Sequence, residues 1–252
     1  MDMRYRYFAP FAFWFLLVVL GKAPLCAQDS SAVVLLRLHY GAFLPFGDMG
    51  QRFGPGFSPG AELQWLGPSN WTAGLQGSFL FGGQVKEDVL ANLRTNEGYI
   101  IGNDRLPADL QLRMRGAYLG GQVGKLWPLG DSPRSGVRFS LGAGWLYHFI
   151  RIQKDPSRYV AQVEGPYGRG YDRLAGGPAG YQWLGYEVHS RNGQVNLYIG
   201  LEILLAFTHP LRDYQFDLRG PETGGGRQDG FIGLRAGWSL PWQFGKRSQI
   251  WY

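Results

Sequence analysis

The sequence has 252 residues, of which 39 are glycine, 15% are aromatic and only 17% are charged. This composition favours one all-β domain over two α/β domains, because glycine permits tight curvature and close approach of strands. The formal net charge is +6, but the basic excess becomes slight once the first 27 residues are set aside, so the sequence predicts no nucleic-acid-binding surface.

The first 27 residues have the pattern of a secretory signal peptide. Arg4 and Arg6 precede an apolar run over about 8–20, and small residues follow it up to Ala27, after which we expect cleavage. The run is shorter than the ~20 residues of a membrane-spanning helix. Cys26 is a weak candidate for lipid attachment, because Ala-Pro-Leu before it lacks the small residue expected at the cleavage position. No cysteine follows residue 27, so 28–252 forms one mature domain without disulfides.

Three strands are predicted in the first part of the mature chain, at 32–46, 60–66 and 71–82. In the first, apolar residues alternate with Arg37 and His39, and in the second Leu63 and Trp65 alternate with Glu62. A glycine- and proline-rich connection at 47–57 joins the first two strands. A tight turn at 67–70 joins the second and third.

The middle of the chain predicts two further strands, at 109–126 and about 137–149. A long polar segment at 83–108 comes before them, and we leave open whether 89–101 contains a short helix or a strand extension. In the strand at 109–126, Leu112 and Met114 lie opposite Arg113 and Arg115, so both arginines are assigned to the polar face. Its second half fits less well, because Leu119 falls on that same face.

The clearest hairpin consists of strands at 181–190 and 194–208 around Asn192-Gly193. Asn-Gly is the preferred pair for a two-residue type I′ turn, because both of its residues need a positive φ. This turn predicts that Val188 faces Leu197, and that Tyr186 and Leu184 face Ile199 and Leu201. Long loops are expected at 153–180 and 209–230, followed by a last strand at 231–240 and a tail after Pro241.

These elements predict an eight-stranded antiparallel up-and-down transmembrane β-barrel. The connectors alternate between short turns and longer loops, and aromatic residues gather at strand ends, as in outer-membrane barrels. We expect a monomer surrounded by outer-membrane lipid, with the short turns on the periplasmic side. The alternative is a secreted sandwich or lipocalin-like barrel, in which Leu197, Leu201 and Leu205 would face inward and Glu187 and Glu202 would face solvent.

The polar faces of the strands predict a network of ion pairs inside the barrel. An eight-stranded barrel is just wide enough for side chains to fill it, and buried arginines need carboxylate partners. A narrow polar conduit is the alternative. The residues assigned to this lumen network are Arg37, Glu62, Arg113, Arg115, Arg138, Glu187, Glu202 and Arg235.

The sequence contains no metal-ligand cluster, nucleotide motif or cofactor site, and we expect no enzyme. His189-Ser190 suggests a lipid hydrolase, but adjacent strand residues face opposite sides, and this pair lies at the short-turn end. The charged long loops are either solvated surface or a docking surface for a partner protein. The partner-loop candidates are Arg169, Asp172, Arg173, Arg212, Asp213 and Asp217.

The chain resembles the small eight-stranded outer-membrane β-barrels in its signal segment, strand number, alternating connectors and C-terminal aromatic residue. The stretches 170–174 and 212–217 are similar to uncharacterised outer-membrane β-barrel proteins of Bacteroidota. The resemblance implies a Gram-negative outer-membrane location but no activity. We expect a non-enzymatic structural or interaction role, specifically as an accessory subunit of an envelope export or assembly complex. A narrow channel for small solutes is the alternative.

Overall fold

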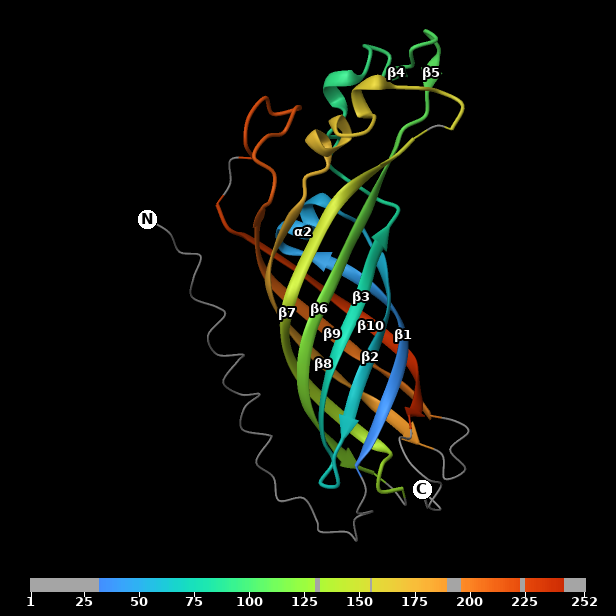
Figure 1. Cartoon of the computed structure of the whole chain (residues 1–252), viewed down its shortest axis with the longest axis vertical. Helices are drawn as coiled ribbons and strands as arrows, with labels where there is room; N and C mark the ends of the chain where they lie inside the picture. The colour runs from blue at the N-terminus through green and yellow to red at the C-terminus, as the bar shows by residue number, and fades with distance from the viewer. Residues whose placement is uncertain (1–31, 130–131, 155, 190–195, 223–224, 243–252) are drawn as a thin grey trace.

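The computed structural model describes residues 32–129, 132–154, 156–189, 196–222 and 225–242, which form a closed barrel of eight antiparallel strands (Figure 1). Each strand pairs with its neighbours along the chain, and the last strand pairs with the first, so the predicted up-and-down barrel is confirmed. The barrel strands are β1 (Val33–Phe46), β2 (Gly56–Leu66), β3 (Trp71–Gly82), β6 (Gln111–Pro128), β7 (Gly136–Gln153), β8 (Ala175–His189), β9 (Asn196–Pro210) and β10 (Arg227–Trp242). The predicted signal peptide, the Asn192-Gly193 turn and the tail after Trp242 lie outside the described residues.

The register between β8 and β9 is the one that the Asn-Gly turn predicts. Val188 pairs with Leu197, Tyr186 with Ile199 and Leu184 with Leu201. Because the side-chain period of a strand is two, a slip of one residue would have moved every apolar side chain to the other face.

Over the middle of the strands the outer wall is apolar, and charged residues lie on the inner face. Leu197 and Leu201 are each 52% exposed, whereas Glu187 and Glu202 are 3% and 0% exposed. This arrangement is the reverse of a soluble sandwich or lipocalin-like barrel, so that alternative is wrong.

The two ends of the barrel differ in their connections. The tight turn between β2 and β3 lies at the lower end in Figure 1, and the long connections lie at the upper end. The upper connections carry α2 (Gly47–Arg52), three 3₁₀ turns (Ala91–Leu93, Ala161–Val163 and Tyr167–Tyr171) and the paired short strands β4 (Ile100–Ile101) and β5 (Pro107–Ala108). The connection expected at 47–57 therefore contains a helix, and β2 begins at Gly56 rather than Gly60. Within the described residues, no helix is long and apolar enough to cross a membrane.

The facing predicted for β6 was wrong at its upper end. Met114 and Tyr118 point into the barrel and are 0% and 2% exposed, so Arg113 and Arg115 lie on the outer wall with Leu119. This part of the strand lies beside the loops, where the inward side chains are apolar and the outward ones are polar.

The inversion has a physical cause, because the loops close the upper end of the barrel with an apolar core. Inward side chains of the strands, among them Phe43, Leu80 and Phe231, pack with Met49 and Phe53 from the α2 segment. Both Met49 and Phe53 are completely buried. The interior is therefore polar only below this lid, whereas the sequence predicted a polar face along each whole strand.

Candidate functional site

The lower part of the lumen holds an ion network centred on Glu187. Oε1 of this carboxylate lies 2.7 Å from Nη2 of Arg37 and 2.6 Å from Nε of Arg138. Glu62 lies 3.6 and 3.5 Å from the same two guanidinium groups, and Arg37 also donates a 2.8 Å hydrogen bond to Gln64. Four strands, β1, β2, β7 and β8, thus contribute charges that meet on the barrel axis.

Aromatic rings complete the environment of these two arginines. The guanidinium carbon of Arg37 lies 3.8 Å from the ring centre of Tyr198, and that of Arg138 lies 4.3 Å from the ring centre of Trp183. Cation–π contacts of this kind are strongest where water is excluded. The two rings also meet edge to face, with their centres 6.0 Å apart.

A second cluster lies above the first and is centred on Arg235. This arginine forms an ion pair with Glu202 and donates a 2.8 Å hydrogen bond to Gln76. Ser58 donates to the other oxygen of Glu202 at 3.1 Å, and Tyr181 lies beneath the guanidinium group. The cluster joins β2, β3, β8, β9 and β10.

The two clusters together form a charge-balanced plug. Their three arginines and three glutamates are each at most 3% exposed. Isolated charges this deeply buried would be strongly destabilising, but paired and hydrogen-bonded charges are tolerated. Six of the eight predicted lumen residues therefore come together, and only Arg113 and Arg115 do not.

A third polar group lies directly under the lid. Nε2 of His148 is 2.7 Å from Oδ2 of Asp229, which also accepts a hydrogen bond from Thr208, and Phe53 packs edge-on against the imidazole. This His–Asp pair is fully buried. His189 is also buried, at the lower end. Among the described residues, no cluster of three or more His, Cys, Asp or Glu side chains could hold a metal ion.

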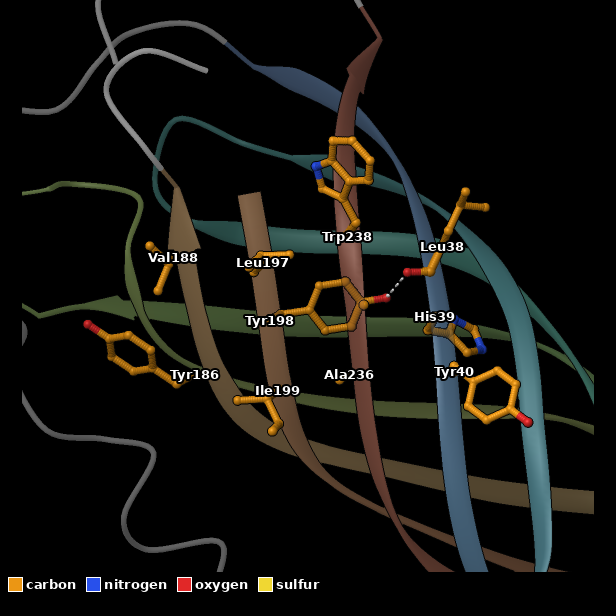
Figure 2. Close-up of a pocket in the computed structure, with 11 residues that line it drawn as sticks. Leu38, His39, Tyr40, Tyr186, Val188, Leu197, Tyr198, Ile199, Ala236 and Trp238 are labelled. Atoms are coloured by element: carbon orange, nitrogen blue, oxygen red, sulfur yellow. Dashed lines mark hydrogen bonds between the residues drawn. The ribbon is translucent and has the colours of Figure 1, made fainter. Parts of the chain in front are cut away.

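A hollow lies on the outer wall of the barrel. It measures about 610 Å³ and spans β1, β8, β9 and β10. Figure 2 shows its cause: Ala236 is small, and the larger side chains of Tyr40, Trp238 and Ile199 stand around it. From the inner side, Tyr198 donates a 3.3 Å hydrogen bond to the carbonyl of Leu38 across Gly237. The hollow is lined by apolar groups and has the character of a lipid-facing surface.

The loops are fastened to each other by buried arginines. Arg52 is 4% exposed and forms ion pairs with Glu87 at 2.7 Å and Glu222 at 2.6 Å. Arg173, equally buried, forms ion pairs with Glu87 at 3.0 Å and Asp217 at 2.5 Å. Arg52 also donates to the backbone carbonyl of Arg173, which ties the loops after β1, β3, β7 and β9 together.

Four of the six partner-loop candidates take part in these internal contacts. Arg173 pairs with Asp217, and Arg212 pairs with Asp172 at 2.5 Å. The hydrogen bonds to Asp172 raise the pKa of the Arg212 guanidinium above its ordinary value. Arg169 and Asp213 are exposed. All six candidates lie in the long loops, and four of them pair with one another, which sequence reasoning did not anticipate.

An exposed aromatic cluster lies beside these ion pairs, and sequence reasoning missed it. Phe216 contacts Tyr167, Tyr171 and Tyr214 with ring centres 5.5–6.4 Å apart. Tyr167 is 61% exposed and Phe216 is 40% exposed. Both long loops carry aromatic residues that could have indicated such a cluster, but nothing in the sequence shows that the two loops meet.

No protein-family model and no curated protein matches the sequence. Solved structures with a similar fold include the attachment invasion locus protein Ail of Yersinia pestis in complex with the heparin analogue sucrose octasulfate. It is 10% identical to this chain with a TM-score of 0.41, and the match covers 83% of this chain and 99% of Ail. Others are Neisserial surface protein A, at 12% identity and a TM-score of 0.39 over 82% and 98% of the two chains, and the outer membrane protein OprG of Pseudomonas aeruginosa, at 11% and 0.35 over 84% and 98%. These are likenesses of fold, and the closed barrel is shown by the chain's own strand pairing.

Proposed function

We propose that this chain is an integral outer-membrane β-barrel with a side-chain-filled lumen that acts through its looped end as a non-enzymatic interaction protein. The specific role proposed is that of an accessory subunit of an envelope export or assembly complex. The observation that carries the proposal is the facing of the strands, which place leucines on the outside of the barrel and paired charges inside it. A closed sheet of this kind satisfies its backbone groups internally and presents apolar side chains to hydrocarbon.

The loop end supports the interaction role. Most surface loops are mobile, but these loops are joined by buried ion pairs and by the apolar lid beneath them. A rigid surface loses little conformational entropy on binding, and exposed aromatic residues are enriched where proteins bind one another. The cluster around Phe216 combines both properties.

A substitution at the middle of the outer wall tests the membrane location. Leu119 is 70% exposed near the centre of β6, so Leu119→Arg should cost about 2–4 kcal/mol of folding free energy in lipid vesicles, where an arginine would contact hydrocarbon. Leu106→Arg, in a loop, is the matched control, since Leu106 is 47% exposed above the barrel. Urea titration of both variants in vesicles measures the difference. Equal stability of the two variants would contradict a membrane location.

Site-specific photo-crosslinking tests the interaction role. A photoreactive residue at Phe216 should produce a discrete crosslinked species in intact cells, because this ring lies at the centre of the exposed aromatic cluster. The same probe at Thr95, an exposed loop position outside the cluster, is the control. The interaction role would be abandoned if both positions gave the same products or none.

A further inference from the structure

Three arginines lie side by side on the outer wall at the upper end of β6 and β7. Arg113 of β6 pairs in register with Arg151 of β7, and Arg115 follows on the same face of β6. Like charges directly opposite each other on a sheet are destabilising unless a counter-charge joins them. Three adjacent positive charges therefore require an explanation.

Their height on the barrel coincides with the edge of the apolar band. On the outward face of β6, the residues between Lys125 and Arg115 are Val123, Gly121, Leu119 and Ala117. Ten residues at ~3.3 Å each, on a strand tilted by about 40°, span roughly 25 Å along the barrel axis, which is the height of the apolar band of such barrels. Arg115 also lies between Phe81 and Phe149 of the neighbouring strands, where an aromatic girdle is expected.

No ion pair joins these three arginines to a carboxylate within the described part of the chain. Arg113 donates to the side chains of Gln153 and Gln111, and Arg115 donates to the backbone carbonyl of Met114. Arg113 borders a hollow of about 520 Å³ that Glu87 and Asp88 also line. Both carboxylates already pair with other arginines of the loops. This contrasts with the lumen, where each arginine has a glutamate.

From these observations we infer that Arg113, Arg115 and Arg151 form a binding site for the phosphate group of an anionic membrane lipid. The planar fork of arginine matches phosphate oxygens, and three such groups around one headgroup would neutralise the repulsion between them. The half-buried phenylalanines beside Arg115, Phe81 and Phe149, would contact the upper part of the acyl chains. The inference rests on the proposed membrane location, because only there does a lipid headgroup reach this height.

Native mass spectrometry of the full chain, titrated with phosphatidic acid or phosphatidylcholine in detergent, tests the site. Replacing Arg113, Arg115 and Arg151 together by Gln should weaken phosphatidic acid binding by about a hundredfold, since each basic residue near an anionic lipid contributes a factor of about five. The control is the triple variant Arg105→Gln, Arg169→Gln and Arg219→Gln, which removes the same charge from exposed loop positions. It should bind like the native chain. Arg151→Gln alone, which changes one exposed side chain, should weaken binding about fivefold.

If the two triple variants lost phosphatidic acid binding to the same extent, the site would be overturned. The same conclusion would follow if the native chain bound phosphatidylcholine as tightly as phosphatidic acid. Displacement of the lipid by an equal concentration of inorganic phosphate would overturn the assignment to a lipid. Vesicle insertion of the same proteins separates this inference from the proposed function. A chain that inserts into neutral vesicles but shows no preference for phosphatidic acid overturns only the site, whereas a chain that does not insert overturns the membrane location.

Discussion

Glu187 neutralises two buried guanidinium groups with one oxygen atom, which makes it the central residue of the plug. Its partners come from β1 and β7, so this one carboxylate links three strands across the lumen. The pairing of these residues could be predicted in kind, because inward arginines and glutamates on a narrow barrel must meet. Which pairs form could not be predicted, since that depends on the stagger of strands far apart in the sequence.

Glu187→Gln should lower the free energy of unfolding by about 3–5 kcal/mol, because it leaves two buried arginines with only Glu62 at 3.5–3.6 Å. Urea-unfolding midpoints of the barrel folded in vesicles measure the change. Glu97→Gln, at an exposed loop position, is the control and should change stability little. If the two variants unfolded at the same urea concentration, the ion network would contribute nothing to stability.

At the scale of the strand, sequence reasoning worked best where a turn fixes the register and worst beside the loops. The Asn-Gly turn predicted the pairing of Val188 with Leu197 because a two-residue hairpin leaves no freedom of register. The facing of β6 failed because Arg113 and Met114 lie at the level of the lid, where the apolar side chain points inward. Leu119, in the middle of the strand, would have indicated the correct facing. Residues at the centre of a barrel strand thus indicate its facing better than residues at its ends.

The pairing of β10 with β1 depends on a glycine. A Cβ atom at position 237 would lie 2.3 Å from the Leu38 carbonyl oxygen and 2.4 Å from the Tyr198 ring, so Gly237→Ala should cost about 1–3 kcal/mol. Gly77→Ala is the matched control, because the nearest atom to its added methyl group would be 3.8 Å away. Thermal unfolding in detergent compares the two. Similar transition temperatures of the two variants would show that the pairing of β10 with β1 can relax around an added methyl group.

For the whole molecule, the buried plug predicts that the barrel does not conduct ions. The three arginines and three glutamates of the lumen are too little exposed to line a water-filled path, and the lid covers them from above. Reconstitution into planar bilayers should therefore give no discrete conductance steps. Steps that disappear in Arg138→Gln or Glu202→Gln would instead favour the narrow solute channel.

The pairing of the first strand with the last also constrains how the barrel can be made. Residues 227–242 are synthesised almost two hundred positions after 33–46, yet the cylinder is complete only when these two segments meet. Until then the leucines of the wall lack a continuous surface, the buried charges lack counter-ions from the opposite side, and both edges of the sheet can pair with foreign strands. We therefore expect partly built forms of the chain to be unstable, and its biogenesis to need a factor that shields the unclosed sheet until the final segment has arrived.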